Sequence, residues 1–182
     1  QILKNNNVTL KNGKLTSTAV TSGKEVKMLI QNYANLTLTD MNLDDATEHI
    51  QYVLSNNSGT SKINGATSIT TDKVAFDVYD YTAGGYTVPI VNVNTTGKIT
   101  GAIEVSESIS NNLNISGGLF TAQIAEAWCA DGYIPTTEVV DGTTYYTVKV
   151  GEYVAQIGDK KYEKFADAIA AVNNAETITL LK

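Results

Sequence analysis

Short stretches in which apolar and polar residues alternate recur along the first two thirds of the chain. They lie at residues 7–17, 35–45, 61–70, 97–106 and 112–121. Such alternation has the period of a β-strand with one buried face, and the Asn and Gly residues that close the stretches favour tight corners. Leu10, Leu38 and Ile63 occupy matching positions, 28 and 25 residues apart. Repeats of this length predict a solenoid, in which each repeat adds one coil to a stack.

The predicted solenoid is mainly β, with parallel strands stacked coil upon coil. One continuous interior row should contain Leu10, Leu38, Ile63 and Ile115. The register is loose, because the interval from Ile63 to Ile99 is 36 residues and the next interval, to Ile115, is only 16. Solenoids tolerate such changes, since an insertion can loop out on one side while the strands stay paired.

The long interval contains a further strand-like segment at residues 74–81, which Gly84 and Gly85 then interrupt. Its apolar side chains should face the core, and the alternate side chains should face outward. Pro89 lies in the segment that follows. Because proline has no N–H to donate, it should mark an edge, a bend or the start of a strand.

Tyrosines gather around this interruption and form the candidate binding surface. Tyr79 and Tyr81 should share the outer face of the segment, with Tyr86 just beyond the glycine pair. An exposed aromatic ring can stack on the apolar face of a sugar while its polar tip forms a hydrogen bond. The predicted ligand-binding residues are Asp77, Tyr79, Tyr81 and Tyr86. The alternative is that these tyrosines only cover a wide coil.

The last third of the chain predicts an end cap and a small second domain. Residues 122–134 fit a short helical turn that lays Trp128 over the last coil, so the solenoid with its cap should span 1–134. The second domain, 135–182, should contain a hairpin that turns at Asp141-Gly142. A β–α–β unit follows, in which the helix carries an apolar stripe. The stripe consists of Phe165, Ala168, Ile169 and Val172.

Residues 117–182 also resemble a known family. The segment GGLFTAQIAEAWCADGYIPTT is similar to a pattern of the form GGTFT-x-DV-x-EYCADGY, and YVAQIGDKKYEKFADAIAAVNNAETITLLK follows it. Together they resemble repetitive, adhesin-like surface proteins of gut-dwelling Gram-positive bacteria. The chain departs from the pattern at Gln123-Ile124, where the family has Asp-Val, and at Ala127-Trp128, where it has Glu-Tyr. Both departures fall in the cap.

The resemblance implies that right-handed parallel β-helix segments alternate with a linking β–α–β motif. It implies a non-enzymatic structural or adhesive module, a rigid stalk of a large secreted protein on the bacterial cell surface. Its partners would be host or microbial glycans or surface proteins, and neighbouring repeats of the same chain. Residues 152–182 would then be the start of a following repeat. The family supplies no catalytic residues.

The charged residues argue against two classes of partner. All 13 basic residues are lysines, they form no cluster, and the formal net charge is −6. Arginine is the usual reader of phosphates and bases, so we expect no nucleic-acid partner. An anionic membrane surface would repel the chain. Since no apolar run reaches about 18 residues, we expect no membrane insertion, and we find neither a signal peptide nor an anchor in this segment.

A metal site has little support in the sequence. The acidic stretch from Asp40 to Glu48 begins like a Ca²⁺ loop, but an EF-hand needs Gly and Glu where Asp45 and Gln51 stand. His49 is the only histidine, so a multi-histidine site cannot form. We therefore expect no metal and no cofactor.

Catalysis has equally little support, and we expect no enzyme activity. Cys129 fits a small apolar residue of the cap rather than a nucleophile. Hydrolases built on parallel β-helices use paired carboxylates, and Asp77 and Asp80, three positions apart on a strand, should face opposite sides. The alternative function is a carbohydrate-binding module or a remnant polysaccharide-degrading β-helix enzyme.

Overall fold

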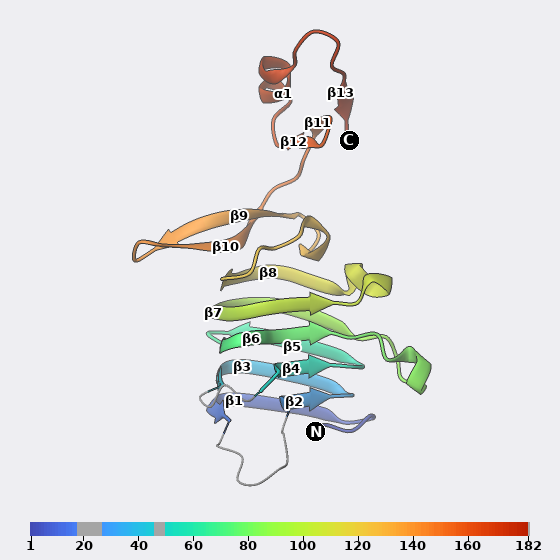
Figure 1. Ribbon diagram of the computed structural model, residues 1–182, viewed down its shortest axis with the longest axis vertical. Coiled ribbons are helices and arrows are strands. Elements are labelled where there is room, and N and C mark those ends of the chain that lie inside the picture. Colours follow the sequence, from blue (N-terminus) through green and yellow to red (C-terminus); the bar gives the residue numbers. More distant parts are fainter. Residues whose placement is uncertain (18–26, 46–49, 182) are drawn as a thin grey trace.

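The larger part of the molecule is a parallel β-solenoid of about four turns (Figure 1). The computed structural model describes residues 1–17, 27–45 and 50–181. The solenoid strands are β1 (Asn7–Thr16), β2 (Met28–Asn32), β3 (Asn35–Asp44), β4 (Tyr52–Asn56), β5 (Thr60–Gly65), β6 (Ser68–Val78), β7 (Ile90–Val105) and β8 (Leu113–Phe120). Strands of successive coils pair in parallel. The predicted parallel solenoid is confirmed.

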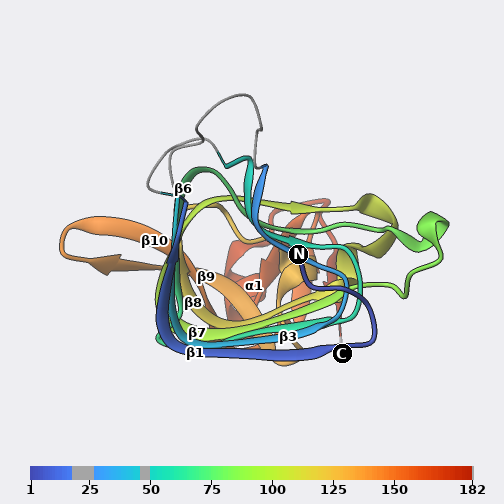
Figure 2. The ribbon, with the colours of Figure 1, turned by 90° about the horizontal axis from the view of Figure 1, so that it is seen from below.

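The coils wrap around three faces, which Figure 2 shows in a view along the stack. The first face contains the first half of β1 and of β3, then β5, the first part of β7, and β8. The second face continues along the same strands past a corner and includes the start of β6. The third face contains β2, β4 and the last parts of β6 and β7.

One interior row runs through every coil of the first face. It passes from Leu10 through Leu38, Ile63 and Val93 to Ile115. Leu38, Ile63 and Ile115 are fully buried, so the predicted row is confirmed. The sequence intervals counted Ile99 as the repeat position between Ile63 and Ile115, and this was wrong. Ile99 lies on the second face, between Ile69 and Phe120. With Val93 in the row, much of the irregular spacing disappears.

The corner between the first and second faces uses left-handed backbone in successive coils. The φ angle is 54° at Asn12, 54° at Asp40 and 63° at Gly65. Asn, Asp and Gly adopt this region most readily, which explains the Asn and Gly residues that close the alternating stretches. The Asp40 carboxylate also accepts a hydrogen bond of 2.8 Å from the backbone N–H of Ala66 in the next coil.

Gly97, near the same corner one coil later, lies directly against backbone. A β-carbon on Gly97 would be 2.1 Å from the carbonyl oxygen of Thr67. We therefore expect Gly97→Ala to destabilise the solenoid by about 1–3 kcal/mol, as overpacking usually does. Gly13→Ala is the matched control, because its β-carbon would lie 3.6 Å from Met41. In urea unfolding, the free energy of unfolding of Gly13→Ala should stay within about 0.5 kcal/mol of the wild-type value. Equal losses of stability in the two variants would contradict the close contact described for Gly97.

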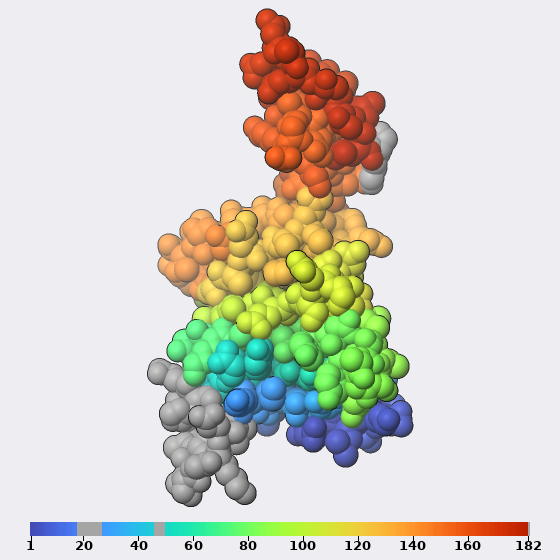
Figure 3. Space-filling model, turned by 45° about the vertical axis from the view of Figure 1, so that its right-hand side comes forward, coloured from blue at the N-terminus to red at the C-terminus, as the bar shows by residue number. Residues whose placement is uncertain are grey.

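The strand predicted over residues 74–81 is shifted, because β6 begins six residues earlier, at Ser68, and also ends three residues earlier than expected. β6 ends at Val78, and the chain then leaves the stack as a loop over residues 79–89 that contains one 3-10 turn, η1 (Thr82–Gly84). β7 begins directly after Pro89, so this proline precedes a strand start. We call residues 79–89 the tyrosine loop; in Figure 3 it is green and lies beside the blue N-terminal residues.

Asp80 holds the tyrosine loop away from the sheet. Its carboxylate accepts hydrogen bonds from the hydroxyl of Thr82 at 2.7 Å and from its backbone N–H at 3.0 Å. The hydroxyl of Ser108, in the 3-10 segment η2 (Glu107–Asn112), donates a third bond of 2.7 Å. These bonds, those with Thr82 first, lower the pKa of Asp80. The competing local bonds explain why the strand pattern does not continue past Val78.

The last coil carries the predicted cap. Its helical turn is the 3-10 segment η3 (Glu126–Trp128). The backbone N–H of Ala130 donates to the carbonyl oxygen of Ile115 at 2.9 Å, which joins the cap to β8. Ile124 is 4% exposed, whereas Trp128 is only partly buried against the core. Both side chains therefore cover the last coil, and Ile124 is the more deeply buried of the two.

The predicted hairpin is also present. It consists of β9 (Tyr133–Val140) and β10 (Thr143–Val150), which turn at Asp141 and Gly142. β10 pairs antiparallel with β8 through Tyr146 and Phe120. The hydroxyl of Thr147 donates to the carbonyl oxygen of Gly118 at 2.7 Å. The hairpin therefore covers an edge of β8 that would otherwise be open.

The C-terminal unit forms a separate lobe beyond the hairpin (Figure 3). It contains β11 (Ala155–Ile157), β12 (Lys160–Tyr162), α1 (Phe165–Ala171) and β13 (Ile178–Leu180). Its sheet is antiparallel, with β11 between β12 and β13. The expected apolar stripe is only partly used, since Ala168 is buried but Phe165 and Ile169 are 45% and 53% exposed. The sheet is too small to cover the whole stripe.

Candidate functional site

Four tyrosine rings pack together on one side of the solenoid. Tyr33 follows β2, Tyr79 and Tyr81 follow β6, and Tyr86 precedes β7. The ring centroids lie 4.8 Å apart for Tyr33–Tyr86, 5.3 Å for Tyr81–Tyr86, 5.8 Å for Tyr33–Tyr81 and 6.2 Å for Tyr79–Tyr81. These are the distances of packed aromatic pairs. We call the group the tyrosine cluster; it unites the three predicted tyrosines and adds Tyr33.

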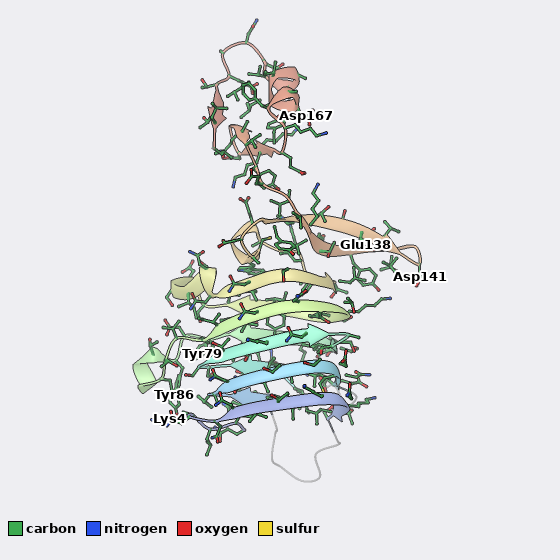
Figure 4. The ribbon with its side chains drawn as sticks, turned by 180° about the vertical axis from the view of Figure 1, so that it is seen from behind. Lys4, Tyr79, Tyr86, Glu138, Asp141 and Asp167 are labelled. Atoms are coloured by element: carbon green, nitrogen blue, oxygen red, sulfur yellow. The ribbon has the colours of Figure 1, made fainter. Side chains whose placement is uncertain are left out.

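A hollow of about 350 Å³ lies on one flank of the tyrosine cluster, and we call it the Lys4 hollow. Its lining includes Tyr33 and Tyr86, together with asparagines of the N-terminal segment and of β3. The ammonium of Lys4 lies 5.4 Å from the centroid of the Tyr86 ring, a cation–π distance. Figure 4 shows Lys4, Tyr86 and Tyr79 along one side of the molecule.

A second hollow of about 550 Å³ borders the cluster at Tyr79, and we call it the acidic hollow. It runs along the third face and is lined by Tyr52, Asp77, Tyr79, Glu104 and Trp128, among others. Asp77 and Glu104 are paired positions on neighbouring coils. The hydroxyl of Tyr52 donates to the Glu104 carboxylate at 3.2 Å. The two hollows therefore differ in charge although they share one aromatic border.

Asp77 is far more buried than the alternation suggested. Only 7% of its surface is exposed. Its carboxylate accepts hydrogen bonds from the backbone N–H of Asn56 at 2.7 Å and from the hydroxyl of Ser55 at 3.1 Å. The pKa of Asp77 is raised to about 6, chiefly by burial and also by the nearby Glu104 charge, while the bonds from Asn56 and Ser55 oppose the rise.

The four predicted site residues do not line one hollow. Tyr86 lines the Lys4 hollow, Asp77 and Tyr79 line the acidic hollow, and Tyr81 packs between the other rings. The partly exposed surfaces, 49% for Tyr79 and 38% for Tyr81, agree with the expectation that these rings face outward. Whether any of them binds a ligand stays a prediction.

Four further residues of this region were not predicted: Lys4, Tyr33, Tyr52 and Glu104. One signal could have revealed Tyr33. Tyr33, Asn57 and Tyr79 each stand directly after a third-face strand, at the same position of successive coils. The backbone N–H of each donates to a carbonyl oxygen of the preceding coil. Burial raises the pKa of Tyr33, helped by Tyr81 and Tyr86, as expected for a ring enclosed by other rings.

The acidic stretch near residue 40 has structural partners where the structure describes it. Asp40 bonds the backbone of Ala66, Asp44 pairs with Lys14 at 2.8 Å, and the buried Asp45 accepts a hydroxyl bond from Ser17 at 2.8 Å. Glu48 and His49 lie outside the described residues. Within residues 1–17, 27–45 and 50–181, no group of three acidic, histidine or cysteine side chains is arranged to hold a metal ion.

Cys129 fits the role of a small cap residue. It pairs with Ile115 through an isolated parallel bridge and contacts the core. Burial, together with the nearby Glu126 charge, raises the pKa of its thiol to about 11. The thiol is therefore protonated near neutral pH, which disfavours a nucleophile.

Comparison of the chain with protein-family profiles, with curated proteins and with solved structures finds no match. Over the described ranges, no helix is long and apolar enough to cross a membrane. The class that the fold defines is a mainly β protein with a parallel solenoid and a small antiparallel C-terminal unit.

Proposed function

We propose that this protein is a non-enzymatic adhesive module of a bacterial surface protein, in which a rigid solenoid presents the tyrosine cluster to a carbohydrate. The observation that carries the proposal is the meeting of four tyrosines from two segments of the chain, Tyr33 and the tyrosine loop, on one outer side. A ring held by its neighbours loses little freedom on binding, so a preorganised aromatic surface favours affinity.

Two further features support a binding role for this side. The tyrosine loop is joined to η2 by hydrogen bonds of the Asp80 carboxylate, so contacts within the protein position it. The rings border hollows of about 350 and 550 Å³, within the range of small-molecule sites, roughly 300–1,000 Å³. The sequence resemblance to adhesin-like surface proteins supports the bacterial surface as its location.

The proposal is tested by screening the purified chain on a glycan array. We expect Tyr86→Ala to lower the signal of the bound glycans about 5- to 150-fold, because a nucleobase stacked on an aromatic ring gains roughly 1–3 kcal/mol and a sugar face on Tyr86 makes a comparable contact. Tyr145→Ala is the matched control, since Tyr145 also lies beside a lysine, with Lys98 5.1 Å from its centroid, but belongs to the hairpin. Absence of any Tyr86-dependent glycan would overturn the proposal.

A second candidate is a polysaccharide-cleaving enzyme, which the acidic hollow favours. Asp77 and Glu104 are neighbours across two coils, and the raised pKa of Asp77, about 6, suits a proton donor. Aromatic side chains of Tyr52, Tyr79 and Trp128 border the same hollow. The test is whether the protein releases reducing ends from a polysaccharide. Such release, if it is lost in both Asp77→Asn and Glu104→Gln, would favour this enzyme over the binding module.

A further inference from the structure

The two hollows on either flank of the tyrosine cluster have opposite charge. The acidic hollow is lined by two carboxylates, those of Asp77 and Glu104, and by no basic side chain of the described residues. The Lys4 hollow is lined by one ammonium, that of Lys4, and none of its described lining residues is acidic. On a chain with a net charge of −6, this hollow is a place where a negative group can approach the aromatic surface with a local attraction.

We propose that the Lys4 hollow binds an anionic sugar, whose ring lies against Tyr33 and Tyr86 and whose carboxylate pairs with Lys4. This inference rests on the proposed carbohydrate-binding function and names the class of ligand for one part of that site. A volume of about 350 Å³ is near the lower end of small-molecule sites, roughly 300–1,000 Å³. The ligand in this hollow is therefore a terminal sugar or a short end of a glycan.

The position of Lys4 is fixed by the fold. Ile2 pairs with Asn32 at the edge of the third face, and the side-chain amide of Asn6 donates to the carbonyl oxygen of Leu3 at 2.8 Å and to that of Lys4 at 3.3 Å. Asn5 adopts φ of 67°, which completes a tight turn. The turn fixes the backbone from which the Lys4 side chain reaches Tyr86, beside which it lines the hollow.

Polar groups around the rings suit a hydroxylated ligand. The side-chain amide of Gln31 donates to the hydroxyl oxygen of Tyr33 at 3.0 Å. Since that bond uses an acceptor position of Tyr33, its own O–H is available to donate to a sugar oxygen. The hydroxyls of Ser58 and Thr87, which also line the hollow, bond each other at 2.9 Å. Aromatic rings, hydroxyls and one cation together match an acidic sugar better than a purely apolar ligand.

The test compares two probes that differ only in the group at C6: methyl β-D-glucuronide, with a charged carboxylate, and methyl β-D-glucoside, with a neutral hydroxymethyl group. Binding is measured by titration with NMR of the backbone amides. At low salt we expect the dissociation constant of the glucuronide to be about 3- to 5-fold lower, the upper part of the range for an exposed ion pair, with shifts at Lys4, Ala34 and Tyr86. The advantage should fall below about twofold at high salt, because ions screen an exposed pair.

Three variants separate the contributions. Lys4→Gln should remove the preference for the glucuronide and leave the weaker binding of the glucoside, whereas Tyr86→Ala should remove both. Lys98→Gln is the matched control, because Lys98 also lies over a tyrosine, 5.1 Å from the centroid of Tyr145, away from the hollow. This variant should retain the preference.

The outcomes distinguish the inference from the function on which it rests. Equal, Tyr86-dependent binding of both sugars would overturn the anionic preference and leave the carbohydrate-binding function in place. Loss of the preference in Lys98→Gln, shifts confined to other parts of the chain, or no saturable shift with either sugar would overturn the assignment of this hollow. Only the absence of any Tyr86-dependent glycan on the array would overturn the proposed function itself.

Discussion

Replacing Phe76 with alanine is expected to lower the free energy of unfolding of the solenoid by about 3–5 kcal/mol. Phe76 is fully buried, and its strand position pairs with Leu54 in the coil below and Ile103 in the coil above. Removing the ring loses its transfer free energy and leaves a cavity between coils that interior packing cannot close. Because each coil contacts only its neighbours, the loss weakens both interfaces of this coil.

The change can be followed in urea through tryptophan fluorescence. Trp128 is the only tryptophan of the chain and packs against the solenoid core, so its emission reports the solenoid. With a denaturant slope of about 2 kcal/mol per M, the midpoint should fall by about 1.5–2.5 M. Phe165→Ala is the control, since Phe165 is 45% exposed on α1 and should leave this midpoint unchanged. Similar shifts in both variants would contradict the packing described for Phe76.

The interior of the first face could be predicted because it obeys a simple pattern. Leu10, Leu38 and Ile63 each alternate with outward polar residues, and the corner residues Asn12 and Asp40 are of types that adopt left-handed backbone. Local sequence therefore carries both the strand period and the corner. Val93 was missed in this row because Pro89, only a few residues earlier, made its segment resemble an edge.

The third face could be predicted only in part, for the apolar residues of β6, because elsewhere its alternation fails. Val53 and Ala75 are fully buried next to the equally buried Leu54 and Phe76, so both sides of these strands are covered. The register also shifts between Val74 and Phe76 where β6 meets β7. A period of two does not persist through a bulge or a doubly covered strand.

The site was predicted only as far as it is local in sequence. Tyr79, Tyr81 and Tyr86 lie within one loop, so their proximity follows from the chain itself. Lys4 and Tyr33 reach Tyr86 only because the coils stack. The assignment of Asp77 to the outer face did not reveal its burial, since the groups that enclose it belong to other coils.

The burial of Asp77 has a consequence for stability as a function of pH. The pKa of Asp77 is raised from an ordinary value of 3.8 to about 6. Between these values the folded protein holds a proton that the unfolded chain has lost, so stability falls as pH rises. Below about pH 3.8 both states are protonated, and above about pH 6 both are ionised, so the change is confined to this window. At 1.36 kcal/mol per pH unit, the loss is about 3 kcal/mol.

Asp77→Asn removes this titration, so its stability relative to the wild type should increase by about 3 kcal/mol between pH 3.5 and pH 7. Urea unfolding of both proteins across that range, followed by Trp128 fluorescence, measures the difference. Glu104→Gln should give a smaller increase of the same sign, because the Glu104 charge contributes to the raised pKa of Asp77. Asp72→Asn, on an exposed position of the same strand, is the control. Its stability relative to the wild type should change by less than about 0.5 kcal/mol between pH 3.5 and pH 7. A stability advantage of Asp77→Asn that shrinks with rising pH would mean that the bonds from Asn56 and Ser55 outweigh burial and stabilise the ionised carboxylate.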